Sequence, residues 1–152
     1  IYTVIVLFGL FVAGTTGEGP LLTVAERKAL LEAVIAAAGK KVRVIAHTGC
    51  FNTPDTIELT RHAYESGATA CSVMAPAFYT FDRAALKAHF VTVAKAVPDF
   101  RVMLYNIPGC THNPIDPDLS IEIAAACPNI AGIKDSSGRI QNVLALIADR
   151  PK

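Results

Sequence analysis

Short apolar segments alternate along the chain with longer segments in which apolar residues recur at helical spacing. The short segments are rich in β-branched residues and are bounded by loops containing Gly, Pro, Asn and Thr. This alternation is typical of βαβ units, whose parallel strands form a sheet covered by helices. The pattern predicts five strands, which span Gly9–Ala13, Val42–Ala46, Ala70–Ala75, Arg101–Tyr105 and Ile130–Lys134. They are mostly apolar, as expected of strands that are covered on both faces.

The longer segments carry helix start and stop signals. Thr23 is followed three residues later by Glu26, which is the pattern of a capping box at a helix start. Thr53 precedes Pro54, a residue favoured at the first helical position, and is therefore the expected cap of the next helix. The expected helices run from Thr23 to Ala38, from Thr53 to the residue before Gly67, from Asp82 to Val97, from Pro117 to Cys127 and from Gln141 to Ala148.

The first part of the chain, Ile1–Ala13, is strongly apolar and could be a signal segment or a membrane span. It is too short for a span, which needs roughly 20 residues. It also lacks the basic start and the small-residue cleavage site of a signal peptide. We therefore expect it to enter the sheet as a buried strand.

Two architectures fit this alternation of strands and helices, the closed eight-stranded barrel and the open doubly wound sheet. Polar and Gly-rich residues follow the strands at 14–18, 47–49, 106–109 and 135–138, so potential ligand contacts are distributed over several strand ends. This distribution is typical of barrels, whereas a dinucleotide-binding sheet carries one dominant G-x-G-x-x-G turn, which is absent here. A complete barrel takes about 250 residues. The sequence therefore predicts one domain over residues 1–152, a partial TIM (β/α)8 barrel of about five βα units without its first and last strands.

Composition narrows the classes of function. The chain is 52% hydrophobic with a net charge of +1, which argues against disorder and gives no electrostatic reason to expect nucleic acid or an anionic membrane as partner. Four cysteines are widely spaced without a C-x-x-C pair, which predicts reduced thiols in a cytoplasmic protein. His62, His89 and His112 lack the spacing of metal ligands, and we expect neither a metal nor an organic cofactor.

Lys134 ends an apolar strand, where an ammonium group has no packing reason to lie. A lysine held in an apolar barrel mouth loses hydration, which lowers its pKa and lets the neutral amine attack a carbonyl carbon. The alternative is a lysine whose charged end extends to solvent.

Tyr105 ends the preceding strand, so its phenol is expected near the Lys134 amine, where it can donate or accept a proton. The alternative is an interior aromatic residue with a hydrogen-bonded hydroxyl.

The turn at residues 14–18 follows the first strand and has the sequence Gly-Thr-Thr-Gly-Glu. Glycines allow the backbone to approach a ligand closely, and hydroxyls beside backbone N–H groups can bind a carboxylate. Thr15, Thr16 and Gly17 are therefore candidates for contact with an anionic substrate. The alternative is an ordinary turn.

Three segments in register, 14–18, 105–109 and 132–138, resemble signatures of the dihydrodipicolinate synthase and N-acetylneuraminate lyase family. The resemblance covers nearly the whole chain from Gly9 onward. It implies a (β/α)8 barrel that forms dimers or tetramers and binds pyruvate or another 2-keto acid as a Schiff base, with no other cofactor. It further implies that Lys134 is the Schiff-base lysine, Tyr105 the catalytic tyrosine and Thr15 the hydroxyl of a proton relay. Thr16 is similar to the threonine that holds the keto-acid carboxylate.

Two departures from the family pattern bear on specificity. Many members have paired tyrosines after the proline of the fourth-strand loop, and here Phe78 stands at the relay position, with Tyr79 next to it as a possible substitute. The synthase has an arginine that binds the carboxylate of aspartate semialdehyde, and here the residue is Cys110. Loss of this bidentate contact favours a lyase that acts on a 2-keto-3-deoxy sugar acid. The candidates for binding sugar hydroxyls are His47, Asn52, Ser136 and Ser137.

The expected function is therefore a Schiff-base, pyruvate-dependent aldolase or lyase of the sugar-acid type. One alternative is dihydrodipicolinate synthase, which joins pyruvate to aspartate semialdehyde. Another is a keto-acid-binding member of the family without activity, an interpretation motivated by Phe78 and the missing strands. A third is that the chain is a fragment of a longer enzyme.

Overall fold

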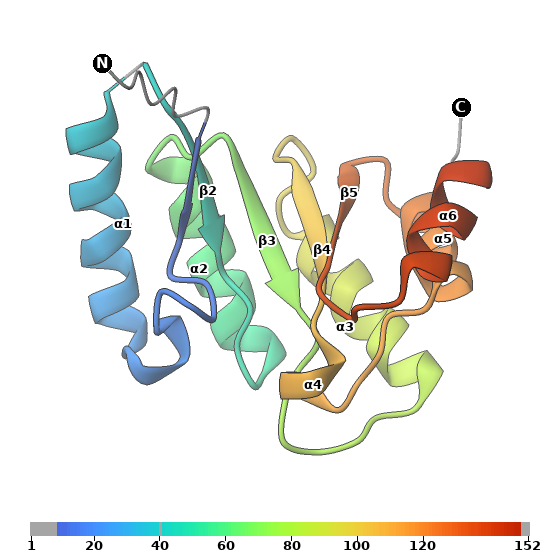
Figure 1. Ribbon diagram of the computed structural model, residues 1–152. Helices are drawn as coiled ribbons and strands as arrows, with labels where there is room; N and C mark the ends of the chain where they lie inside the picture. Colours follow the sequence, from blue (N-terminus) through green and yellow to red (C-terminus); the bar gives the residue numbers. More distant parts are fainter. Residues whose placement is uncertain (1–8, 40, 150–152) are drawn as a thin grey trace, which may run out of the picture.

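The computed structural model describes residues 9–39 and 41–149, which form one parallel sheet with helices packed against it (Figure 1). The strands are β1 (Gly9–Val12), β2 (Arg43–His47), β3 (Ala70–Met74), β4 (Val102–Asn106) and β5 (Ile130–Asp135). They lie side by side in chain order, and each is parallel to the next. This confirms the predicted strands, whose bounds differ from the observed ones by no more than one residue at either end.

The strand order distinguishes between the two architectures that the sequence allowed. A doubly wound sheet reverses its strand order at one point, and helices then cover both faces. Here the order β1-β2-β3-β4-β5 never reverses, and the connecting helices lie on one side of the sheet, as in a barrel wall (Figure 1). The fold is therefore a partial (β/α)8 barrel, as predicted.

The helices α1, α2, α3, α5 and α6 correspond to the five predicted ones, and two short helices come in addition. Their bounds are α1 Val24–Ala38, α2 Thr53–Glu65, α3 Arg83–Lys95, α4 Pro108–Thr111, α5 Pro117–Ala126 and α6 Ile140–Ala148, with a 3₁₀ helix at Gly19–Leu21. The Thr23–Glu26 capping box is present at the start of α1. The expected cap of α2 is wrong, because the Asn52 side chain accepts the hydrogen bond from the Asp55 N–H, and Thr53 is already helical.

The hydrophobic core lies between the helices and the outer face of the sheet. Val73 of β3 and Leu104 of β4 point into it and are completely or almost completely buried. Phe90 of α3 and Ile123 of α5 cover them from the helix layer. The opposite, inner face of the sheet carries a different set of side chains, which includes the predicted chemical groups.

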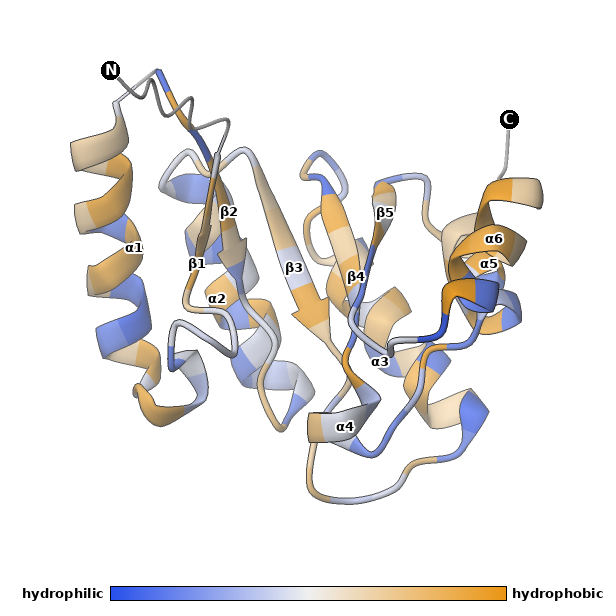
Figure 2. Ribbon diagram, in the orientation of Figure 1, coloured by the Kyte–Doolittle hydropathy of each residue, from blue (hydrophilic) through white to orange (hydrophobic). Residues whose placement is uncertain are grey.

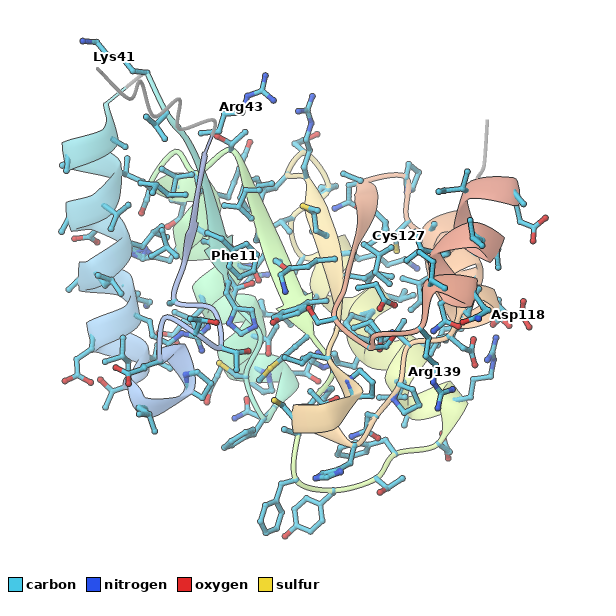
Figure 3. The ribbon with its side chains drawn as sticks, viewed as in Figure 1. Phe11, Lys41, Arg43, Asp118, Cys127 and Arg139 are labelled. Carbon is cyan, nitrogen blue, oxygen red and sulfur yellow. The ribbon has the colours of Figure 1, made fainter. Side chains whose placement is uncertain are left out.

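All strands end at the same edge of the sheet, the lower edge in Figure 1, where α4 and the long β3–α3 loop also lie. The labelled side chains of Lys41 and Arg43 mark the opposite edge (Figure 3). Loops that follow parallel strands therefore gather at one end of the barrel wall. This is the end at which barrel enzymes place their active sites.

One flank of the structure is apolar and open. Ile140, Leu144 and Ile147 of α6 are 61%, 58% and 61% exposed, and no residue of this helix is buried. Figure 2 shows the hydrophobic colouring of α6 on the outside of the fold. A groove of about 500 Å³ runs between α5, β5 and α6. The flank therefore leaves an apolar surface of α6 uncovered in the described chain.

Part of the apolar run at the start of the chain forms β1, as expected, and residues 1–8 of that run lie outside the described residues. Among the helices that the structure describes, none is both long and apolar enough to cross a membrane. The four cysteines are free thiols. The cytoplasmic location stays a prediction.

Candidate active site

The register between β4 and β5 brings the two predicted chemical groups together. Tyr105 and Lys134 are direct neighbours across the two strands. The Lys134 Nζ lies 3.8 Å from the centroid of the Tyr105 ring and 5.7 Å from that of the Phe11 ring. Aromatic faces attract an ammonium group at such distances. Lys134 is half-buried on the inner face of the sheet, and its amine does not simply extend to solvent.

Hydroxyl groups surround this pair. The Thr15 Oγ1 lies 3.3 Å from the Tyr105 hydroxyl, and the Lys134 Nζ donates a hydrogen bond of 2.8 Å to the Ser136 Oγ. Burial acts to raise the pKa of Tyr105, but the nearby Lys134 ammonium group and the Thr15 hydroxyl lower it below its ordinary value. A phenol with a lowered pKa can exchange a proton more readily near neutral pH.

The turn that carries Thr15 is tightly folded. The Glu18 N–H donates to the Thr15 carbonyl at 3.1 Å, and the Gly19 N–H donates to the Gly14 carbonyl at 3.1 Å. A side chain at Gly19 could not be accommodated, because its Cβ would lie 1.9 Å from the Ala13 carbonyl oxygen. Thr15 is half-buried against Tyr105. Thr16 and Gly17, the other two candidates on this turn, lie on its exposed side.

A second set of hydrogen bonds fixes the ends of β4 and β5. The Asn106 Nδ2 donates to the Asp135 Oδ2 at 2.8 Å, and the Asn106 carbonyl accepts from the Ser136 N–H at 2.8 Å. The Ser137 N–H and hydroxyl both donate to the other carboxylate oxygen of Asp135, at 2.8 and 2.6 Å. Partial burial acts to raise the pKa of Asp135, but the bonds from Ser137 and Asn106 lower it. The residues directly after Tyr105 and Lys134 are thus joined to each other.

His47 lies next to Tyr105 but is 3% exposed. Its ring is edge-on to the Tyr105 ring, with the ring centroids 5.6 Å apart, and its Nδ1 lies 3.0 Å from the Ala13 carbonyl oxygen. Burial and the charge of Arg27 lower the pKa of His47 from its ordinary 6.5 to about 3. The ring is therefore neutral at physiological pH.

The two departures from the family pattern lie in the loops at the same end of the barrel wall. Phe78 and Tyr79 are 78% and 68% exposed, and their rings pack edge to face at 4.9 Å. Phe78 has a φ of 80°, a left-handed conformation that is unusual for a bulky residue. Cys110 is exposed on α4. A relay role for either aromatic residue stays a prediction.

The structure adds residues that the sequence reasoning missed. Phe11 borders the Lys134 amine, and Asn106 and Asp135 fix the strand ends. The buried Asn113 organises the β3–α3 loop, because its Nδ2 donates to the Pro76 and Tyr79 carbonyls. A signal for two of these existed, since Asn106 and Asp135 follow the predicted catalytic residues on neighbouring strands.

No group of three or more His, Cys, Asp or Glu residues in the described ranges 9–39 and 41–149 could hold a metal ion. His62 contacts Glu32 at 2.9 Å, and His89 is buried against Thr53. The assembled groups are instead an amine, a phenol and hydroxyls within a few ångströms of one another. Such a set can form an imine with a carbonyl compound and move a proton beside it.

Comparisons with known proteins agree with the resemblance seen in the motifs. A family model described as the dihydrodipicolinate synthetase family matches residues 6–151. The chain is 39% identical over 143 residues to 4-hydroxy-tetrahydrodipicolinate synthase of Bacillus subtilis, covering 94% of this chain and 49% of that protein. It is 42% identical over 145 residues to the enzyme of the same name from Listeria welshimeri, and the match covers 95% of this chain and 49% of that protein.

Solved structures match the fold as well. The structure of dihydrodipicolinate synthase from Aquifex aeolicus has a TM-score of 0.87 and 35% identity, and the match covers 91% of this chain and 47% of that one. The structure of YagE, a prophage protein of the dihydrodipicolinic acid synthase family from Escherichia coli in complex with pyruvate, has a TM-score of 0.88 and 36% identity, with 92% and 47% covered. The chain thus spans about half the length of the relatives it matches.

Proposed function

The chain belongs to the dihydrodipicolinate synthetase family, and from this premise we propose that the full protein is a pyruvate-dependent aldolase in which Lys134 forms a Schiff base. The observation that carries the proposal is the position of the Lys134 Nζ, 3.8 Å from the centroid of the Tyr105 ring. The Tyr105 hydroxyl in turn contacts Thr15. A nucleophile beside a group that can move protons is the arrangement that imine chemistry requires.

In this proposal the neutral Lys134 amine attacks the keto carbon of pyruvate, and water leaves as the imine forms. Tyr105 gives its proton to the hydroxyl group that leaves as this water, and the resulting phenolate then takes a proton from the pyruvate methyl group, which gives an enamine. Its carbon attacks the carbonyl carbon of an aldehyde, and Tyr105 supplies the proton that the new alkoxide oxygen takes up. Hydrolysis of the imine then releases the product, and the same steps in reverse cleave the carbon–carbon bond. The water that hydrolyses the imine returns a proton to Tyr105, and the Thr15 hydroxyl passes it along its contact with the phenol.

We propose aspartate semialdehyde as the aldehyde. The relatives at 39% and 42% identity are named 4-hydroxy-tetrahydrodipicolinate synthase, which favours the synthase alternative over the sugar-acid lyase expected from the sequence. Thr16 and Gly17, exposed on the turn beside Thr15, are proposed to bind the carboxylate of pyruvate through hydroxyl and backbone N–H groups.

One observation favours a second candidate, the cleavage of 2-keto-3-deoxy sugar acids. Cys110 is exposed on α4 and cannot make the charge-assisted contact of an arginine with a second carboxylate. Ser136 and Ser137 at the end of β5 would then serve as ligands for sugar hydroxyls. Ser137 already donates to Asp135, so Ser136 is the better placed of the two.

A substrate panel on the full-length protein tests the proposal. Pyruvate consumption with aspartate semialdehyde is expected, and pyruvate release from 2-keto-3-deoxy acids should be much slower. Cys110→Arg should raise kcat/KM for aspartate semialdehyde, while the matched control Cys110→Ala should leave it unchanged. Cleavage of the deoxy acids alone would support the second candidate. Pyruvate binding without any turnover would indicate a binding protein.

A further inference from the structure

We propose that His47 is a positioning residue, which holds the Thr15 turn through its Nδ1–H and thereby places the Thr15 hydroxyl on Tyr105. The inference rests on the proposed function for the step in which Tyr105 moves a proton. It replaces the sequence-based interpretation of His47 as a ligand of sugar hydroxyls. It assigns the residue to the geometry of the proton relay.

The hydrogen bond to Ala13 fixes the protonation of the imidazole. The His47 Nδ1 lies 3.0 Å from the Ala13 oxygen, which can only accept, and 3.3 Å from the Arg27 Nη2, which can only donate. The Arg27 Nη2 already donates to the His47 carbonyl at 2.6 Å, so the shorter contact to Ala13 assigns the hydrogen to Nδ1. In a neutral ring the Nε2 then has none. This Nε2 is buried and has no hydrogen-bond partner in the part of the chain that the structure describes. The hydrogen bond that the His47 ring makes is therefore the one from Nδ1 to the Ala13 carbonyl.

Arg27 of α1 holds the backbone around His47. Its guanidinium, 6% exposed, donates to the His47 carbonyl at 2.6 Å and to the Gly49 carbonyl at 3.1 Å. No carboxylate in residues 9–39 and 41–149 forms a salt bridge with it. This uncompensated charge lies 3.3 Å from the His47 Nδ1 and opposes protonation of the ring. Burial and this charge thus keep the His47 ring neutral.

The carbonyl that His47 binds belongs to a strained residue. Ala13 has a φ of 55°, in the left-handed region that a non-glycine residue adopts only at an energetic cost. Gly19 packs directly against the same carbonyl. The two contacts together hold the start of the turn, and Thr15 follows two residues later.

The contact that depends on this turn is sensitive to small movements. The distance of 3.3 Å between the Thr15 Oγ1 and the Tyr105 hydroxyl is longer than the about 2.5–3.0 Å that is usual between two hydroxyls, so this contact has little room to lengthen. A relaxation of Ala13 towards an ordinary backbone conformation would therefore break it. Loss of this bond would raise the pKa of Tyr105 and slow proton transfer without removing Lys134 from the site.

Two amide variants distinguish between the roles of the two ring nitrogens of His47. His47→Asn can place its amide N–H near the position of Nδ1, whereas His47→Gln reaches the position of Nε2. Both variants remove the aromatic edge against Tyr105, so they are matched controls for each other. The experiment measures kcat and KM for pyruvate in the full-length protein. It also follows the titration of the Tyr105 phenol by ultraviolet difference absorbance, with the Tyr105→Phe variant as the reference that lacks this phenol.

The proposal predicts that His47→Asn keeps kcat within a few-fold of the starting protein. His47→Gln should lower kcat by about 100-fold, the lower end of what a general acid or base contributes, with KM for pyruvate nearly unchanged. The phenol titration should move to higher pH in His47→Gln only. Equal effects in both variants, or rescue by His47→Gln alone, would overturn the proposal.

A further variant tests whether His47→Gln acts through the Thr15 hydroxyl. Thr15→Val removes the same hydroxyl contact directly and should reproduce the upward shift of the Tyr105 titration. In the double variant the two shifts should not add, because both act on one bond. Additive shifts would overturn the proposal. The phenol titration needs no substrate, so it tests the role of His47 even if the protein does not turn over pyruvate. A failure to turn over pyruvate would contradict the proposed function and not the role of His47.

Discussion

The geometry between the Lys134 amine and the Tyr105 ring is fixed by the residues that follow them. Asn106 and Asp135 are paired in the strand register and joined at 2.8 Å. Ser137 supplies two further hydrogen bonds to the same carboxylate. The ends of β4 and β5 are therefore held together just where the chemical groups project from them.

Asp135→Asn tests this connection. The new amide cannot accept from both Asn106 and Ser137, so at least one donor loses its partner, and hydrogen bonds to charged groups are worth about 1.5–3 kcal/mol each. We expect a free energy of unfolding lower by roughly 2 kcal/mol in denaturant titrations, and a lower kcat. The same substitution at the exposed Asp118 should change neither quantity appreciably. Equal stability of the two variants would contradict the assigned role.

The sequence predicted that Lys134 and Tyr105 lie close together, because polar groups at the ends of neighbouring apolar strands are conspicuous, and the strand register confirms this proximity. It did not identify Arg27 as a buried group, since its position in α1 shows only that it lies on a helix. Its burial depends on how α1 packs against the end of β2, where carbonyl oxygens accept its hydrogen bonds. Such contacts between distant segments cannot be read from local spacing.

Capping and packing explain how the helices were predicted and where the prediction was wrong. The Thr23–Glu26 box and the Asp82 cap follow local rules and are observed. Thr53 was the expected cap of α2, but Asn52 takes this role. The Thr53 hydroxyl is instead used in a contact with α3, where it lies 2.9 Å from the His89 Nδ1.

Burial of His89 makes the α2–α3 packing sensitive to acid. Burial lowers the pKa of His89 from its ordinary 6.5 to about 4. Between these values the unfolded chain binds a proton that the folded chain does not, so the stabilising contribution is complete above pH 6.5 and is lost towards pH 4. From pH 7 to pH 5, His89 should lower the free energy of unfolding by about 2 kcal/mol. His47, with a pKa of about 3, acts in the same direction.

Denaturant titrations at pH 7 and pH 5 measure the effect. His89→Asn keeps an amide near Thr53 but does not titrate, so its loss of stability over this range should be smaller by about the His89 contribution. An unchanged pH dependence in His89→Asn would show that His89 is not buried in its neutral form.

The strand count and order follow from the alternation of β and α segments, because parallel strands joined by helices leave few topologies. The exposure of the flank formed by β5 and α6 could not be predicted from this alternation. Apolar residues of α6 recur at helical spacing, which is typical of a helix that packs against other elements, yet none of them is buried. A homo-oligomeric state of the full protein stays a prediction.

We expect residues 1–152 produced alone to self-associate. The open edge of β5 and the three exposed apolar residues of α6 provide the surface, as aggregation-prone sheet edges and apolar patches do. Sedimentation velocity should detect oligomers or aggregates, and a double variant with Ile140→Lys and Ile147→Glu should shift the distribution towards monomer. A monodisperse monomer of the unsubstituted chain would contradict this prediction.

Reductive trapping with pyruvate and borohydride tests the assignment of Lys134 most directly. In the full-length protein, the peptide that contains Lys134 should gain the mass of one pyruvate less one oxygen atom. Tyr105→Phe should still be loaded while turning over slowly, and Lys95→Ala should be loaded like the starting protein. Lys134→Ala should take up no pyruvate. An adduct on another lysine, or no adduct at all, would contradict the assignment of Lys134 as the Schiff-base residue.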